Sequence, residues 1–324
     1  MFGAYSELDV SQSLRAAGQR LRLRASETPR ALVLVYHAIA RRTGDRATEI
    51  VPPHAADLLD AHMLHLRRHY EVIEPAAVLS AAAARGRADR APVAVTFDDD
   101  LPSHVRLAAP VLERHAVRTT FFLTGAGLDG PVTFWWERLQ RAFDRGLEAE
   151  DRRRLADACG LAPEALGGPE AIRRVSRAVQ ELADGEPAKA LIASLAGPDS
   201  DDTGLRPADV RRLIDGGHRI GFHTLRHDRL PGLDDGRLGR ALEDGRDRLA
   251  RIAGPLEQIA YPHGRGDERV AAAAARAGFK LGFTTRWRAV RPEDDPRLIG
   301  RLEPPFASPA RFAAAVAATL GERP

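Results

Sequence analysis

The sequence predicts an α/β protein in which parallel strands alternate with helices. The main observation is a series of apolar, β-branched runs of strand length, at residues 31–39, 70–75, 92–99, 119–125, 218–224, 257–264 and 280–285. Segments with apolar residues at helical spacing lie between these runs, and strands that alternate with helices usually pair in parallel. With 324 residues, 44% of them hydrophobic, the chain is long enough to bury a large core. Seven such strands fit either a barrel or an open, doubly wound sheet.

Helices are predicted between the strands from the spacing of their apolar residues. After the first strand these residues are Leu58, Leu59, Met63, Leu66 and Tyr70. Later in the chain a single helix is indicated by Leu238, Leu242, Leu249 and Ile252. This helix should end at Gly254, because the Gly254-Pro255 pair does not continue a helix. Residues 267–278 predict a further helix, with Gly278 directly after its last turn.

Residues 131–205 interrupt the alternation of strands and helices. Apolar residues lie four positions apart at Trp135, Leu139, Phe143 and Leu147. A second set with helical spacing consists of Ile172, Val175, Val179 and Leu182. We therefore expect one domain over residues 31–324, with a helical insertion at about residues 131–205 between two of its strands.

Residues 1–30 form a basic arm ahead of this domain. Its arginines outnumber its acids, and three leucines accompany them: Leu14, Arg15, Arg20, Leu21, Arg22, Leu23, Arg24 and Arg30. Two interpretations stay open, a weak association with a membrane surface and a frayed, solvated terminus, and we favour the second. No apolar run approaches about 20 residues, so no membrane-spanning helix is expected.

Composition limits the classes of partner and cofactor. The formal net charge is +3, from 48 basic and 45 acidic side chains, so binding to nucleic acid is not expected. The single cysteine, Cys159, excludes a disulfide framework and a thiolate metal cluster. The N-terminus lacks a basic segment followed by an apolar one, so we expect a cytoplasmic protein unless a signal segment has been removed.

Polar side chains follow directly after the predicted strands. His37 follows the first strand, Asp98–Asp100 end the strand at 92–99, and the pair His223 and His227 follows a later one. Residues 261–263, Tyr-Pro-His, follow the next strand. The carboxyl ends of parallel strands lie at one rim, so these side chains should converge there.

The pattern of these residues indicates a metal site. His223 and His227 are four positions apart, so both rings can reach one ion if the segment is helical or tightly turned. Asp98 and Asp99 are neighbours and should point to opposite sides, so that one can bind metal while the other stays free as a base. Two histidines and a carboxylate, with an open position for water, form the typical ligand set of catalytic zinc.

Three motifs carry a resemblance to a known family. "TFDD" (96–99), "HTLRH" (223–227) and "AYPHG" (260–264) resemble the first three motifs of polysaccharide deacetylases of the carbohydrate esterase family 4 type. The likeness covers roughly residues 31–305. It implies a distorted (β/α) barrel of about seven parallel strands and a divalent metal, usually Zn²⁺. It also implies hydrolysis of N-acetyl groups on an amino sugar in a polysaccharide, oligosaccharide or glycolipid, with O-acetyl esters as an open alternative.

The resemblance also implies roles for individual residues. Asp98 would be the general base, and Asp99, His223 and His227 would be the metal ligands. Substrate or the neighbouring shell would be contacted by Tyr261, Pro262, His263, Asp100 and Arg301.

The chain departs from the family pattern at several positions. Asp100 replaces the usual glycine after "TFDD", and Ala260 stands where an arginine commonly steadies the base. Arg301, in "GRLEPP", is our candidate for that missing cation. The late motif whose histidine protonates the leaving group is not evident, and we assign that role to His37 in "VYHAI".

Two other functions compete with deacetylation. In a phosphatase of the haloacid dehalogenase type, Asp98 would be the nucleophile, Asp100 the acid and Lys280 the cation, but the paired histidines would then have no role. Alternatively, the missing arginine and the missing late histidine would suit a catalytically degraded, carbohydrate-binding protein.

Overall fold

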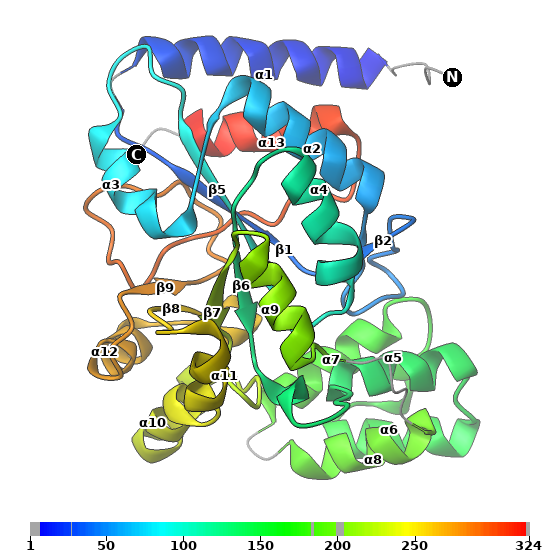
Figure 1. The fold of residues 1–324 in the computed structure, drawn as a ribbon. Helices are drawn as coiled ribbons and strands as arrows, with labels where there is room; N and C mark the ends of the chain where they lie inside the picture. Colours follow the sequence, from blue (N-terminus) through cyan, green and yellow to red (C-terminus); the bar gives the residue numbers. More distant parts are fainter. Residues whose placement is uncertain (1–6, 27, 183–184, 199–203, 322–324) are drawn as a thin grey trace.

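The computed structural model describes residues 7–26, 28–182, 185–198 and 204–321. At its centre the strands follow the order β1, β5, β6, β7, β8 and β9, with β4 also paired to β5, and every pairing is parallel (Figure 1). The strands are β1 (Leu32–Tyr36), β4 (Glu71–Ile73), β5 (Pro92–Asp98), β6 (Thr120–Leu123), β7 (Arg219–Phe222), β8 (Gln258–Ala260) and β9 (Leu281–Phe283). Two-residue strands β2 (Ile39–Ala40) and β3 (His54–Ala55) pair separately. All seven strands expected from the sequence are confirmed.

The sheet curls into a barrel that is closed by an irregular segment, residues 299–302, which we call the closing segment. Ile299 bridges to Phe283 of β9, and Leu302 bridges to Leu34 of β1, both in the parallel sense. These bridges join the two edges of the sheet. The distorted barrel is therefore confirmed, and the open, doubly wound sheet is excluded.

Alternate residues of the strands point to the two faces of the barrel wall. One face packs against the surrounding helices and forms the main apolar cluster. The other face supplies a second buried cluster, which includes Val33, Ala94, Phe122, Ala260, Phe283 and Ile299. Asp98 lies four residues after Ala94 on β5, so the same alternation places it on this inner face, above the apolar floor.

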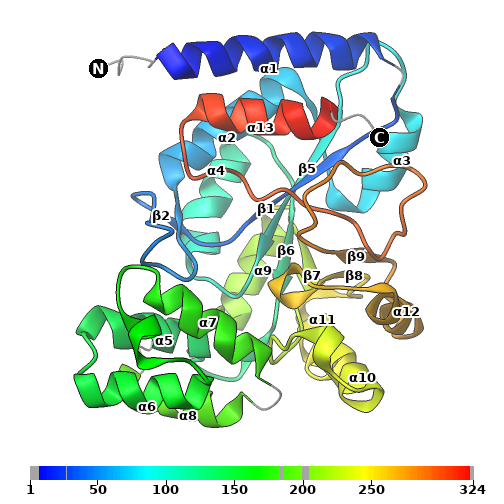
Figure 2. The ribbon, with the colours of Figure 1, turned by 180° about the vertical axis from the view of Figure 1, so that it is seen from behind.

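Helices cover the outside of the barrel (Figures 1 and 2). They are α2 (Ala56–His69), α3 (Val78–Ala84), α4 (Ala109–Arg114), α9 (Pro207–Asp215), α10 (Asp235–Glu243), α11 (Arg246–Ala253), α12 (Glu268–Arg276) and α13 (Pro309–Gly321). Gly278, with φ of 84°, follows α12 as predicted. The single helix predicted around residues 238–252 is wrong: α10 and α11 are separate, because Gly245 between them has φ of 79°, outside the helical region.

The basic N-terminal segment forms a helix, α1 (Glu7–Ala25), that lies along α13 (Figures 1 and 2). Ala16 is completely buried in a cluster with Ala313 and Ala317, and these small side chains allow the two helices to approach closely. The frayed, solvated terminus expected from the sequence is therefore wrong for residues 7–25. None of the described helices is both long enough and apolar enough to cross a membrane.

Four helices lie between β6 and α9, where the sequence analysis places the helical insertion. They are α5 (Trp135–Arg145), α6 (Ala149–Cys159), α7 (Ala171–Glu181) and α8 (Glu186–Ala196). Their apolar faces form a cluster of their own, which includes Leu139, Leu155, Val175 and Ile192. In both ribbon views these green helices form a unit at one end of the molecule (Figures 1 and 2).

Candidate active site

The carboxyl ends of the strands surround a cavity of about 530 Å³. Its lining includes His37, Asp98, Asp99, His223, His227, His263 and Arg301. Helices of the insertion contribute Trp135, Trp136 and Gln180 to the same lining. The cavity therefore lies between the barrel rim and the insertion, which forms one of its walls.

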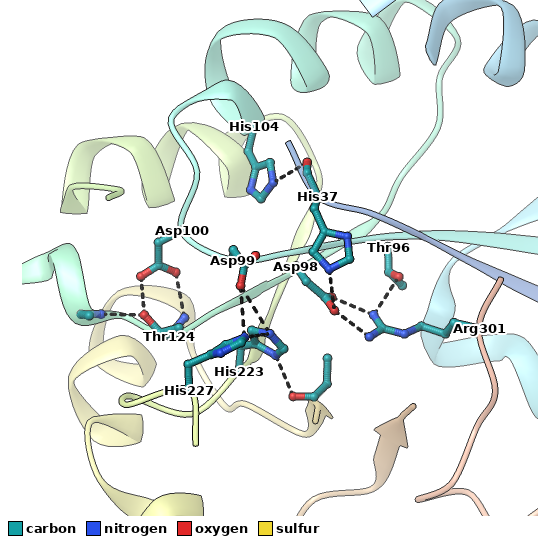
Figure 3. Close-up of polar contacts among 12 residues, drawn as sticks. His37, Thr96, Asp98, Asp99, Asp100, His104, Thr124, His223, His227 and Arg301 are labelled. Carbon is teal, nitrogen blue, oxygen red and sulfur yellow. Dashed lines mark hydrogen bonds and ion pairs between the residues drawn. The ribbon is translucent and has the colours of Figure 1, made fainter. Parts of the chain in front are cut away.

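Asp99, His223 and His227 converge at this rim (Figure 3). The Oδ1 atom of Asp99 lies 3.5 Å from Nε2 of His223 and 3.5 Å from Nε2 of His227. The two Nε2 atoms are 3.2 Å apart. A tetrahedral ion with ligand bonds of about 2.0–2.1 Å holds its ligand atoms about 3.3–3.4 Å apart, so the observed triangle has the dimensions of one face of such a site.

The chemistry of the three side chains also suits a cation. Asp99 Oδ1 is buried and accepts no hydrogen bond within the described part of the chain. Burial raises the pKa of Asp99, because the ionised carboxylate lacks solvent there. Burial, followed by the neighbouring histidines, lowers the pKa of His227 well below its usual value. The ring of His227 is therefore neutral and can use a lone pair as a ligand.

Neighbouring groups orient the two histidine rings. Nδ1 of His223 lies 2.8 Å from the Ala260 carbonyl and donates to it, which leaves the Nε2 lone pair facing Asp99. The ring of His227 packs between Trp136 and His263, with centroid distances of 4.5 Å to each. The apolar indole thus restricts water on one side of the histidine pair.

The loops that carry these groups are strained. Six described residues other than glycine have positive φ, and four of them belong to the site: Asp99, Thr224, His227 and His263, with φ of 75°, 56°, 54° and 58°. Each such conformation costs roughly 1–3 kcal/mol and persists only where the surroundings impose it. The segment 223–227 is a tight turn rather than a helix, one of the two forms that the sequence analysis allows.

Asp98 has a built-in counterion. The Arg301 guanidinium donates two hydrogen bonds to its carboxylate, at 2.7 and 2.6 Å, and both side chains are buried. Arg301 also donates to Thr96 Oγ1 at 3.2 Å and to the Thr284 carbonyl at 3.1 Å. Burial alone raises the pKa of Asp98, but the charge of Arg301 and the hydrogen bonds that it donates outweigh burial and lower the pKa to about 2. Arg301 therefore occupies the place that the sequence analysis gives to the missing cation.

His37 lies next to Asp98 (Figure 3). Its Nε2 is 4.0 Å from Asp98 Oδ2, and its side chain is 28% exposed toward the cavity. The buried ring of His104 contacts the His37 carbonyl at 3.2 Å through Nε2 and fixes the loop after β1. Sequence reasoning did not assign His104 to the site, because its spacing on the chain relates it only to the helix that it begins.

Three residues that the sequence analysis places at the substrate or in the neighbouring shell do not line the cavity. Asp100 accepts hydrogen bonds from the backbone N–H and the hydroxyl of Thr124, at 2.8 and 2.6 Å, and is a structural residue. Tyr261 is turned away and donates to the Arg297 carbonyl at 2.8 Å, while Pro262 is buried beside it. This geometry also opposes the phosphatase alternative, because Asp100 is not available as its acid.

Thr96 is a further residue that sequence reasoning missed. It lies two positions before Asp98, so strand alternation could have placed it on the same face. The contribution of Gln180 had no comparable signal, because it depends on how the insertion docks against the barrel.

Comparison with known proteins supports the same assignment. The family model for polysaccharide deacetylase matches residues 85–152 and 178–282, and the stretch between these ranges falls within the helical insertion. The search of curated proteins found no match.

Several solved structures share the fold. The deacetylase PplD of Streptococcus pyogenes, solved in complex with acetate, is 17% identical with a TM-score of 0.56, over 85% of this chain and 92% of that one. IcaB of Ammonifex degensii is 20% identical with a TM-score of 0.55, over 90% and 97%. The de-N-acetylase of Aggregatibacter actinomycetemcomitans is 16% identical with a TM-score of 0.54, over 86% and 96%. Because the family model covers more than half of the sequence, the chain belongs to the polysaccharide deacetylase family.

Proposed function

We propose that the protein is a metal-dependent hydrolase that removes N-acetyl groups from an amino sugar in a polysaccharide, oligosaccharide or glycolipid. The observation that carries this proposal is the triangle formed by Asp99 Oδ1 and the Nε2 atoms of His223 and His227, next to the Arg301-paired Asp98. Membership of the deacetylase family supports the reaction class.

Asp99, His223 and His227 would hold the cation, and their nitrogen and oxygen donors suit zinc. When bound, such a cation acts as a Lewis acid and lowers the pKa of water at the site. The groups of this chain that would hold a positive ion are the neutral ring of His227, Nε2 of His223 and the unpaired oxygen of Asp99.

Asp98 would accept the proton of the attacking water. The pair with Arg301 keeps its carboxylate ionised, and each carboxylate oxygen retains a further lone pair beside the bidentate contact. Arg301 also fixes the orientation of the carboxylate, so that its position is set before the substrate enters.

His37 would donate a proton to the departing nitrogen. It lies on the cavity wall, partly exposed, with its Nε2 4.0 Å from Asp98 Oδ2. His104 holds the backbone of His37 in place. This arrangement separates the two proton-transfer groups, with Asp98 buried at the floor and His37 nearer the entrance.

The proposal is tested by an acetate-release assay with N-acetylglucosamine oligosaccharides. We expect activity that a chelator abolishes and that added zinc restores. An O-acetylated oligosaccharide, assayed in parallel, distinguishes amide from ester hydrolysis. Stoichiometric zinc binding without acetate release from any of these sugars would contradict the proposal and would favour the carbohydrate-binding alternative.

A further inference from the structure

A second cavity, of about 200 Å³, lies beside the active-site cavity and is lined by four arginines, Arg173, Arg177, Arg229 and Arg265. We call it the arginine pocket. Ile50 and Gln180 line both this pocket and the active-site cavity, so the two share a wall. A ligand bound in one cavity is therefore next to the other.

The loops of the active site and the insertion together build the arginine pocket. Arg229 follows His227 by two residues on the loop after β7, and Arg265 follows His263 by two residues on the loop after β8. Arg173 and Arg177 lie one turn apart on α7. Like charges at this spacing destabilise a helix slightly, so their position is unfavourable unless a negative group faces them.

The positive charge of the pocket is only partly compensated. Glu181 is the one acidic residue in the lining, and the carboxylates that act on Arg173 from outside it are Glu303, Glu170 and Asp45. In the described part of the chain, the side chains of Arg177 and Arg265 make no hydrogen bond or ion pair, and the buried Nε of Arg229 has no partner. By contrast, Arg226, which lines a further cavity that also includes Arg229, forms an ion pair with Asp244, with the charged atoms 3.3 Å apart.

Arg173 is held differently, by the backbone. Its Nη2 donates to the Glu49 carbonyl at 2.8 Å, and its Nε donates to the Arg46 carbonyl. These contacts fix the guanidinium without neutralising it. The pocket thus combines one arginine that is held by backbone carbonyls with three arginines that have no acidic partner among the described residues.

The loop after β8 connects the pocket to the active site. His263 lines the active-site cavity, and Arg265, two residues later, lines the arginine pocket.

We propose that the arginine pocket binds a phosphate group carried by the substrate, so that the sugar deacetylated in the adjacent cavity is a phosphorylated one. This assignment rests on the proposed deacetylase function. Guanidinium groups bind phosphate oxygens through paired, charge-assisted hydrogen bonds. Four arginines against one glutamate suit a phosphate, which carries more charge and more acceptor oxygens than a carboxylate.

The first experiment measures binding directly. Isothermal titration with inorganic phosphate and with N-acetylglucosamine 1-phosphate is carried out on the zinc-loaded protein. It is repeated after chelation, which distinguishes binding at the metal from binding in the arginine pocket. We expect the double variant R177Q/R265Q to bind both probes at least about tenfold more weakly, because hydrogen bonds to charged groups are lost. The control R153Q/R154Q removes two arginines of α6 that pair with Glu150 and Asp151, and its affinity should stay at the wild-type value.

The second experiment identifies the source of the phosphate. Acetate release from N-acetylglucosamine 1-phosphate is compared with release from N-acetylglucosamine. We expect wild type to favour the phosphorylated sugar in kcat/KM by about tenfold or more, and R177Q/R265Q to lose this ratio mainly through KM. R153Q/R154Q should keep the ratio.

The outcomes separate this assignment from the proposed function. Phosphate affinity that does not change in R177Q/R265Q would overturn the assignment of this pocket as a phosphate site. Arginine-dependent binding of inorganic phosphate without a preference for the phosphorylated sugar would overturn its assignment to the substrate and would indicate free phosphate as the ligand. Arginine-dependent binding without acetate release from any N-acetylated sugar would support the pocket and contradict the deacetylase function. Melting temperatures of the variants confirm that each is folded.

Discussion

Asp98 and Asp99 are neighbours in the sequence and are equally buried, yet their surroundings are opposite. Asp98 accepts two hydrogen bonds from Arg301, and its pKa falls to about 2. Asp99 Oδ1 has no donor among the described residues, and burial raises its pKa. One carboxylate has its positive partner within the chain, whereas the other needs one from outside. This difference supports the two proposed roles, proton transfer for Asp98 and metal binding for Asp99.

The largest effect is expected where the external partner is lost. His223→Ala removes one of the two proposed nitrogen ligands, so metal content should fall from about one ion per chain to almost none, and acetate release should fall to background. Metal analysis after dialysis and the acetate assay measure both quantities. His69→Ala, which removes a histidine on α2, is the matched control and should change neither. Full metal occupancy in His223→Ala would contradict the ligand assignment.

Asp98→Asn tests the other side of the comparison. The variant should retain metal, because Asp98 is not among the three convergent ligand atoms, but kcat should fall by about 10²–10⁴-fold through the loss of the proton acceptor. Equal loss of metal in Asp98→Asn and His223→Ala would show that the two carboxylates do not divide their roles as proposed.

The internal counterion of Asp98 should also matter for stability. Arg301→Met leaves a buried carboxylate without its cation, which typically costs about 3–5 kcal/mol in the free energy of unfolding. Urea unfolding measures this loss. Arg219→Met is the control, because its ion pair with Glu74 is exposed and should contribute less than about 1 kcal/mol.

A double variant sharpens this prediction. Replacing both partners, in Asp98→Leu with Arg301→Met, should recover much of the lost stability while leaving the protein inactive, because no unpaired buried charge remains. If Arg301→Met alone were as stable as wild type, the buried pair would contribute nothing to the fold.

Much of the site could be predicted because its signals are local. Asp98, Asp99, His223 and His227 follow apolar strands directly, and parallel strands bring their carboxyl ends together. The strand series likewise indicated the parallel sheet, although seven strands alone left a barrel and an open sheet unresolved. The resemblance to the family, rather than periodicity, favoured the barrel.

The parts that sequence could not predict depend on long-range packing. Arg301 reaches Asp98 because the closing segment bridges β9 and β1, and this segment has no strand periodicity of its own. The packing of α1 depends on alanines, and these small residues produce only a weak apolar periodicity in the sequence. The arginine pocket depends on how α7 docks beside two loops of the barrel, and its arginines are of a kind usually found at the surface.

A smaller effect is expected on the stability of the protein at acidic pH, where His54, which is buried without an ion pair, differs from Asp98, which is buried with one. Burial lowers the pKa of His54 to about 4, although its hydrogen bond to the Pro304 carbonyl opposes the shift. In the unfolded chain this histidine takes up a proton near its usual value of 6.5, so protonation favours unfolding as the pH falls from about 6.5 to about 4. The pKa of Asp98 is also lowered, but this group is an acid, so the lowered pKa stabilises the folded protein. Its contribution to stability persists down to about pH 4 and is lost only as the pH approaches 2.

We therefore expect His54 to account for a loss of about 2 kcal/mol in unfolding free energy between pH 7 and pH 5. His54→Phe keeps an aromatic ring against Phe306, whose ring centroid is 3.9 Å away, but it cannot take up a proton. Urea unfolding at the two pH values should show a smaller difference for this variant than for wild type, whatever its stability at pH 7. Asp98→Asn should leave the difference between pH 7 and pH 5 unchanged, since the Arg301-paired carboxylate stays ionised throughout that range. An equal pH dependence in His54→Phe and wild type would contradict the lowered pKa of this buried histidine.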